Sequence, residues 1–272
     1  MIERDSNTIS PWQQTAFKSS SAAAAHNHTY DVLIVGAGIT GLTTALFLQQ
    51  AGKKCVLAEA RTIGFGTTGG TTAHLNTFFD ATYADIESDF DEETAKSVAD
   101  AGKETLDMMK NLIDTYQIDC DFEYKDAYVF SENEQEKKLL KDILASSRKA
   151  GIHAIEERDN QVPVPFEMVI QYTDQAQFHP LKYISKLAEL FIEAGGVLLE
   201  NTFISKTTFE NHVHTAESGD VSITARHLVY ATHLPPGINL LNFRCAPYRS
   251  YVLGVKLKNE DYPKALIYDM QE

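Results

Sequence analysis

The chain has 272 residues, of which 38 are acidic and 24 are basic, and its formal net charge is −14 at pH 7. A surface of that sign repels phosphate groups, so we expect no nucleic-acid partner. The apolar runs are too short to cross a bilayer, the N-terminus lacks the apolar stretch of a signal peptide, and the three cysteines form no CxxC pair. Together these features predict a cytoplasmic protein without a membrane partner.

The first 29 residues are polar and rich in Ser, Ala and Gln, which predicts a flexible N-terminal arm. Trp12 is the exception, because its indole ring favours docking on the body of the protein. From Tyr30 onward, strand-like apolar runs alternate with helical patterns. That alternation is typical of an α/β sheet with covered faces.

Residues 30–61 form the strongest pattern, YDVLIVGAGITGLTTALFLQQAGKKCVLAEAR, which reads as strand, glycine turn, helix and strand. Gly36 permits a tight turn, Gly38 lets the backbone approach a pyrophosphate, and Gly41 lets the helix pack closely. The helix N-terminus would direct its unpaired amides at the phosphates. Glu59, at the end of the second strand, could accept hydrogen bonds from a ribose. The pattern therefore predicts a dinucleotide site.

The segment that follows, EARTIGFGTTGGTTAHLNT, is rich in glycine and threonine. Its backbone amides and hydroxyls could reach a pyrophosphate and then the edge of a flavin ring. NAD alone would leave this segment without an obvious role. We therefore expect FAD rather than NAD, while an ordinary flexible loop stays open as the alternative.

Further elements follow from hydrophobic periodicity and turn residues. The pattern predicts an antiparallel meander over residues 202–226. The other expected elements are helices over 40–50, 86–116, 132–149 and 181–194, and strands over 54–59, 122–130, 169–172, 197–200 and 228–231.

Three blocks, SPWQQTAF, GTTGGTTAHLN and QAQFHPLKYISKLAEL, carry a family resemblance. With the first glycine motif, they resemble FAD-dependent oxidoreductases of the D-amino-acid oxidase superfamily. More narrowly, they are similar to the subgroup whose members often carry a C-terminal Rieske iron–sulfur domain. The resemblance runs from about Ser10 to the end of the chain.

This resemblance implies an α/β fold of the glutathione-reductase-like type. A Rossmann-like FAD-binding domain with a β-meander would comprise residues 30–82 and 178–236. A smaller mixed α/β substrate domain, interleaved with it and incomplete, would comprise residues 83–177 and 237–272. The arm over residues 1–29 would precede both.

The resemblance also implies which residues hold FAD. They would cradle the pyrophosphate, bind the adenosine ribose, line the path to the flavin ring and meet the adenine. The expected cofactor-binding residues are Gly36, Gly38, Ile39, Thr40, Gly41, Glu59, Ala60, Arg61, Gly66, Thr67, Thr68, Gly70, Thr71, Thr72, Ala73, His74, Ile204, Ala231 and Thr232. The family usually has glycine where this chain has His233, which puts the local backbone path in doubt.

Enzymes of this kind act on C–N bonds of amines or amino acids by hydride transfer to the flavin, so the resemblance implies a small-molecule substrate. Arg249 could pair with a substrate carboxylate, and Tyr251 could line the same pocket. A surface or structural role is at least as good a reading for the arginine, and tyrosines in a strand more often serve simple packing. The His-x-His pairs at residues 26–28 and 212–214 lack acidic or cysteine partners, so no metal site is predicted.

The chain shows neither the Cys-x-His pattern of a Rieske cluster nor the family's second glycine-rich element. We therefore expect it to be the N-terminal portion of a longer flavoenzyme, with a C-terminal segment missing. The exposed surfaces would favour a homodimer, weak FAD retention and inactivity of the chain alone. An NAD(P)-linked dehydrogenase and a non-catalytic dinucleotide- or partner-binding module stay open as alternatives.

Overall fold

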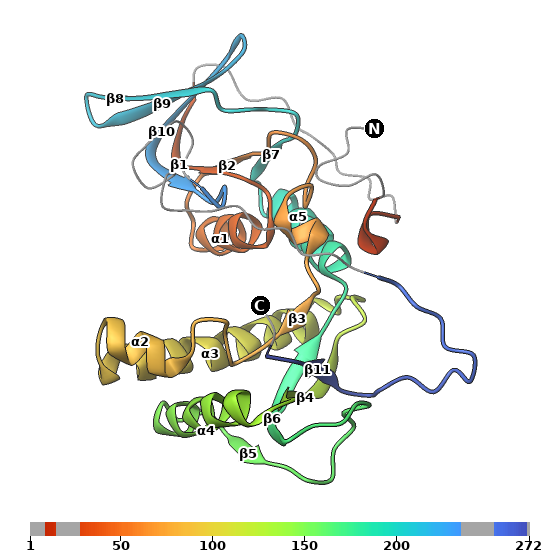
Figure 1. Ribbon diagram of the computed structural model, residues 1–272. Coiled ribbons are helices and arrows are strands. Elements are labelled where there is room, and N and C mark those ends of the chain that lie inside the picture. The colour runs from red at the N-terminus through yellow and green to blue at the C-terminus, as the bar shows by residue number, and fades with distance from the viewer. Residues whose placement is uncertain (1–8, 15–27, 235–252, 271–272) are drawn as a thin grey trace. The chain divides into compact units, whose positions relative to one another are not determined.

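The computed structural model describes residues 9–14, 28–234 and 253–270, which form two compact units (Figure 1). The first unit comprises Met1–Thr72 and His179–Ser250, and the second comprises Ala73–Phe178 and Tyr251–Glu272. The first change of unit thus falls at residue 72, where the sequence placed it at residue 82. Within the described residues, no helix is long and apolar enough to cross a membrane.

The first unit contains a six-stranded mixed sheet in the order β7-β2-β1-β10-β9-β8. β1 pairs in parallel with β2 and β10, and β2 pairs in parallel with β7, whereas β8, β9 and the first half of β10 form an antiparallel meander. Near-continuous apolar runs such as CVLA in β2 suit a parallel strand buried on both faces. The strands are β1 (Thr29–Val35), β2 (Cys55–Ala58), β7 (Val197–Leu199), β8 (Lys206–Glu210), β9 (Val213–Ser218) and β10 (Val221–Tyr230).

β10 differs from its prediction, which ended the meander at residue 226 and began a separate strand at 228. The structure has one continuous strand, Val221–Tyr230. Residues 221–225 pair antiparallel with β9, and the strand also pairs in parallel with β1 from Thr224 to Tyr230. The apparent break in the sequence pattern is therefore a change of neighbouring strand, since the alternating residues lie in the meander and LVY lies beside β1.

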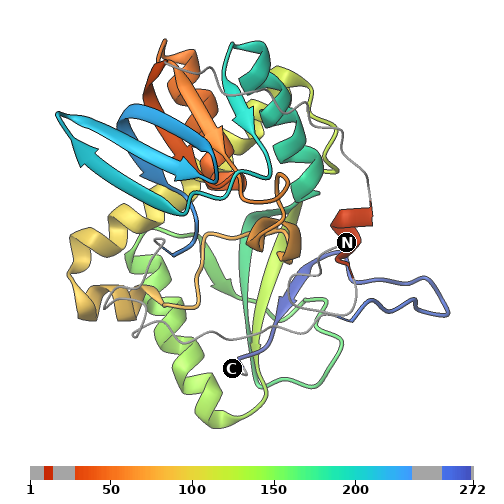
Figure 2. The same ribbon diagram turned by 90° about the horizontal axis from the view of Figure 1, so that it is seen from above.

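Two helices of the first unit, α1 (Ile39–Gln50) and α5 (Pro180–Glu193), pack against each other beside this sheet (Figures 1 and 2). His179 is the N-cap of α5, and its Nδ1 atom accepts a hydrogen bond from the Lys182 N–H at 3.3 Å. Pro180 follows at the first helical position, where its missing N–H costs nothing. Two short 3₁₀ turns, η1 (Pro11–Gln14) and η2 (Thr67–Gly70), complete the unit.

The second unit contains a sheet in the order β11-β4-β6-β3, with β5 also paired to β6. Apolar side chains of the sheet, among them Ile170 and Tyr172, form a core with Ala99, Leu140 and Leu144 from the helices. The elements are β3 (His74–Leu75), α2 (Tyr83–Asp89), α3 (Glu92–Tyr116), β4 (Glu123–Ser131), α4 (Glu134–Lys149), β5 (Ala154–Glu156), β6 (Met168–Gln177) and β11 (Leu266–Tyr268).

Two predictions for this unit were wrong in detail. The helix expected over 86–116 is divided into α2 and α3, because Asp91 caps a new helix by accepting a hydrogen bond from the Thr94 N–H at 2.7 Å. β6 extends to Gln177, well beyond the expected end at residue 172. Its polar second half stays in the sheet because Gln175 is buried and bonded to Thr77, whose N–H donates to Gln175 Oε1 at 2.6 Å.

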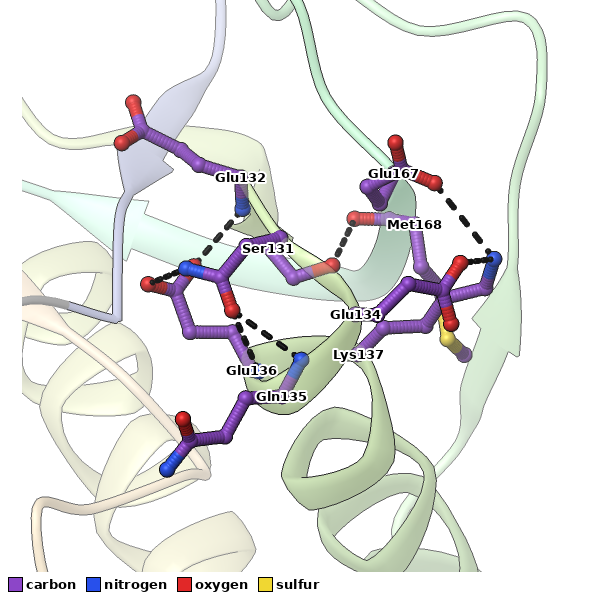
Figure 3. Close-up of polar contacts among 9 residues, drawn as sticks. Ser131, Glu132, Glu134, Gln135, Glu136, Lys137, Glu167 and Met168 are labelled. Carbon is purple, nitrogen blue, oxygen red and sulfur yellow. Dashed lines mark hydrogen bonds and ion pairs between the residues drawn. The ribbon is translucent and has the colours of Figure 1, made fainter.

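The start of α4 shows how one helix is fixed by its first turn (Figure 3). Asn133 Oδ1 accepts hydrogen bonds from the N–H groups of Gln135 and Glu136, both at 3.0 Å. Glu136 reaches back, and its carboxylate accepts from the Glu132 N–H at 2.7 Å. These bonds satisfy amides that have no partner within the helix.

Replacing Asn133 with alanine is expected to lower the free energy of unfolding of the second unit by about 1 kcal/mol, because two first-turn amides lose their acceptor. Urea titration followed by circular dichroism measures the change. Glu134→Ala is the matched control, since it removes only an exposed ion pair with Lys137, worth a few tenths of a kcal/mol. Equal losses in the two variants would contradict the role of the cap.

Candidate functional site

The carboxyl ends of four parallel strands meet at one edge of the first unit's sheet. Gly36 leaves β1 there with φ +104°, a conformation that glycine adopts readily and other residues rarely do. Its N–H donates to Ala58 O on β2 at 2.8 Å, and the Ala231 N–H donates to Val35 O at 2.8 Å. The turn after β1 is thus bonded to both neighbouring strands.

The other two glycines of the motif allow the start of α1 to approach this turn. A Cβ atom on Gly41 would lie 1.8 Å from the Gly36 carbonyl oxygen, and one on Gly38 would lie 3.0 Å from Thr68 Oγ1. The Ile39 N–H donates to Thr68 Oγ1 at 3.1 Å. The remaining first-turn amides of α1 have no partner within the helix and carry the positive end of its dipole, so they suit an anionic group.

Glu59 ends β2 and binds the backbone on both sides of the site. Its Oε2 accepts from the Ala37 N–H at 2.8 Å, and its Oε1 accepts from the Arg61 N–H at 2.9 Å. A carboxylate has about four lone-pair positions, so each oxygen retains capacity for a further donor such as a ribose hydroxyl. Glu59 therefore fixes the glycine turn while remaining able to meet a ligand.

The glycine- and threonine-rich segment lies against the same turn. The Gly64 N–H donates to Ala37 O at 3.0 Å, and a Cβ on Gly69 would lie 2.3 Å from Gly64 O. Thr68, from η2, supplies the hydroxyl at the start of α1. Sequence reasoning missed Glu200, whose Oε1 accepts from the Ile63 N–H at 2.7 Å. Its position in the sequence could have indicated this role, because Glu200 directly follows β7, just as Glu59 directly follows β2.

The candidate residues after position 200 lie partly in the core of the first unit and partly at the glycine turn. Ile204 is buried in the core with Leu33 and Val56, so its side chain packs inward. Ala231 and Thr232 follow β10 and lie against the glycine turn, with a Cβ on Gly36 falling 2.6 Å from Ala231 O. His233 has φ +68°, so the backbone keeps a conformation that favours the glycine usual in the family.

Two candidates, Ala73 and His74, belong to the second unit, where Ala73 has φ +64°. His74 Nδ1 lies 2.5 Å from the Tyr268 hydroxyl, which also accepts from Asn76 Nδ2 at 2.9 Å. Burial lowers the pKa of His74 and raises that of Tyr268. The sequence offered no sign of this pairing, since 194 residues separate its members.

The lowered pKa of His74 predicts a pH effect on stability. Because the folded-state pKa lies below the ordinary value of 6.5, the neutral ring contributes its full stability above that pH. This contribution is lost as the pH falls through the folded-state pKa. Unfolding measured between pH 7.5 and 5 should therefore show a smaller acid loss in His74→Gln than in the parent chain. An identical loss would contradict the prediction.

The predicted substrate-positioning residues, Arg249 and Tyr251, lie outside the described residues. Apart from Ile204, the described candidates in the first unit converge at the carboxyl edge of the parallel strands or in the segment packed on it. They are residues 36–41, 59–61, 66–72 and 231–232.

A set of parallel strands whose first member leads through a glycine turn into a helix, with an acidic residue ending the second strand, defines a dinucleotide-binding protein. The chain belongs to the FAD dependent oxidoreductase (DAO) family, whose sequence profile matches residues 31–271. The match confirms the predicted family, its class of enzyme and its cofactor, FAD.

Curated relatives support the same assignment. YhfW of Bacillus subtilis (strain 168), which bears the name of a Rieske 2Fe-2S iron-sulfur protein, is 30% identical over 263 residues, 96% of this chain and 52% of the relative. Gamma-glutamylputrescine oxidoreductase of Escherichia coli (strain K12) is 26% identical over 250 residues, 88% of this chain and 58% of the relative. The chain thus spans about half the length of these relatives. The first name agrees with the predicted Rieske-associated subgroup.

Solved structures share the fold. Glycine oxidase from Geobacillus kaustophilus has a TM-score of 0.65 and 17% identity, and the likeness covers 75% of this chain and 55% of that one. L-proline dehydrogenase from P. horikoshii has a TM-score of 0.62 and 19% identity, covering 75% and 53%. These similarities confirm the predicted α/β fold class.

Proposed function

We propose that the first unit holds the adenosine and pyrophosphate half of FAD in an enzyme that oxidises C–N bonds of amines or amino acids. The observation that carries this proposal is the cradle at the edge of the sheet. There, the first-turn amides of α1, the Glu59 carboxylate and the Thr68 hydroxyl are gathered around one glycine turn. Its chemistry, amide donors beside an acceptor carboxylate, suits a pyrophosphate linked to a ribose.

In this proposal each group has one task. The amides of Thr40 and Gly41 neutralise pyrophosphate charge, and Glu59 accepts hydrogen bonds from the adenosine ribose. Residues 66–72 carry the path toward the flavin ring, and burial, which lowers the pKa of His74, favours its neutral ring. Bound FAD supplies the acceptor for a hydride from the carbon that bears the nitrogen.

The substrate class rests on the relatives. One is a gamma-glutamylputrescine oxidoreductase, and the structural neighbours include a glycine oxidase and an L-amino acid deaminase. We therefore propose a small amine or amino acid as substrate, with Arg249 and Tyr251 as the groups that position it. A homodimer, and a continuation of the polypeptide that completes the flavin site, are parts of the same proposal.

Ligand competition tests the cofactor half-site directly. Fluorescence titration should give saturable binding of FAD to the purified chain. ADP should displace FAD because it carries the adenosine and pyrophosphate groups, whereas riboflavin should not. Displacement by riboflavin but not by ADP would refute the assignment of the half-site. The absence of any FAD binding would favour the non-catalytic module instead.

A further inference from the structure

The N-terminal 3₁₀ turn is bonded to the glycine- and threonine-rich segment, a feature that the cofactor proposal leaves unused. Ser10 Oγ donates to the Gly69 carbonyl oxygen, and Trp12 Nε1 donates to the Thr71 carbonyl oxygen at 2.8 Å. Both bonds span 59 residues of sequence. The turn also stabilises itself, since the Gln13 N–H donates to Ser10 O at 3.0 Å.

Both acceptors are main-chain carbonyls, so these bonds fix the orientation of peptide groups. The peptide unit is planar and trans, and its C=O and N–H point in opposite directions. A Thr71 carbonyl held toward Trp12 therefore turns the Thr72 N–H to the other side of the segment. Holding this plane presents a backbone donor away from the turn without requiring it to reorient when a ligand binds.

Trp12 also connects this segment to the start of α5. Its ring meets the His179 ring edge-on, with centroids 5.0 Å apart and an interplanar angle of 67°. His179 is itself fixed, because its Nδ1 accepts from the Lys182 N–H. The indole ring thus contacts the N-cap residue of α5, while its N–H binds the glycine- and threonine-rich segment.

We propose that Ser10 and Trp12, together named the N-terminal clamp, are positioning residues that preorganise residues 66–72 for FAD. This proposal rests on the proposed function, because it assigns the clamp to the same half-site. It predicts that the clamp contributes to cofactor affinity without touching the cofactor. The chemistry explains the residue type, since indole offers a single N–H donor together with an apolar ring.

Two substitutions separate the donor from the ring. Trp12→Phe keeps an aromatic ring beside His179 but removes the N–H, whereas Trp12→Ala removes both. We expect the Kd for FAD to rise about tenfold in Trp12→Phe, as for the loss of one hydrogen bond, and further in Trp12→Ala. Phe209→Ala, which removes an exposed aromatic side chain from the edge strand β8 of the same unit, is the matched control and should leave the Kd unchanged.

A second readout works without FAD. Amide hydrogen exchange of residues 66–72 should quicken in Trp12→Phe and Trp12→Ala but not in Phe209→Ala. Trp12 is the only tryptophan in the chain, so its emission in the parent protein should be blue-shifted and partly shielded from iodide.

The outcomes are distinguishable. Unchanged exchange and unchanged Kd in Trp12→Phe would overturn the clamp, as would a Trp12 emission equal to that of the unfolded chain. If the parent chain binds no FAD, the proposed function fails; quickened exchange in the variants would then still support the clamp, and unchanged exchange would overturn it.

Discussion

Replacing Gly41 with alanine is expected to abolish measurable FAD binding and to lower the free energy of unfolding of the first unit by about 3 kcal/mol or more. The added Cβ would lie 1.8 Å from the Gly36 carbonyl oxygen and 3.4 Å from Ala231 Cβ. Because the Gly36 carbonyl oxygen is a backbone atom, no side-chain rotation can relieve this clash. The start of α1 must move away from the turn, and the amides that the half-site needs move with it.

Urea unfolding followed by Trp12 fluorescence measures this change, because the only tryptophan belongs to the first unit. Gly66→Ala is a matched control for folding: a Cβ there meets nothing within 4 Å, and φ is −74°. A Gly41→Ala chain as stable as the control would show that the close approach of α1 to the turn is absent in solution.

Glu59→Ala is expected to cost about 2–3 kcal/mol and to reduce FAD affinity at least tenfold. The substitution leaves the amides of Ala37 and Arg61 without their acceptor. Hydrogen bonds to a charged group contribute about 1.5–3 kcal/mol each, and these two lie at or below the lower end of that range because one is part-buried and the other is exposed to water. The stability loss arises in the cofactor-free chain, so it is measured by urea unfolding before any ligand is added. Affinity is then measured separately by fluorescence titration.

Glu59→Gln sharpens the test, because its side chain retains one carbonyl oxygen. We expect it to recover about half of the stability while keeping low FAD affinity, since one of the two amides still finds an acceptor. Glu210→Ala removes an exposed glutamate at the end of β8 and should change stability by less than about 0.5 kcal/mol. If Glu59→Ala matched Glu210→Ala, the carboxylate would have no role in holding the turn.

The local elements of the first unit were largely predictable from the sequence, because glycine positions and apolar strands act over short range. The turn after β1, α1 and β2 all form where the pattern indicates. Sheet membership was not predictable to the same degree. The pairing of β10 with both β9 and β1 depends on strands far apart in the chain, so the sequence pattern divided this strand at its change of neighbour.

The candidate site likewise contains residues that the sequence predicted and contacts that it did not. Gly36, Gly41 and Glu59 follow from a motif whose spacing reflects local geometry, and the structure gathers them at one sheet edge. The contact of Trp12 with Thr71 and that of His74 with Tyr268 have no local signal, because tertiary structure alone brings those residues together. Gln175 shows another limit of the sequence: the predicted strand ended at residue 172, yet bonds to Thr77 permit the burial of Gln175 within β6.

The position of β10 in the sequence delays the pairing of β1 during translation. The first strand emerges from the ribosome early, but its partner residue Thr224 follows Thr29 by 195 positions. At about 5–20 residues per second, translation needs on the order of 10–40 s to deliver that partner. Throughout this interval the edge of β1 that pairs with β10 has no partner strand, while the intervening second-unit residues 73–178 are already available to fold. Nascent chains therefore expose an apolar strand edge, and we expect chaperones to bind them at that stage. This exposure follows from the insertion of the second unit within the sequence of the first.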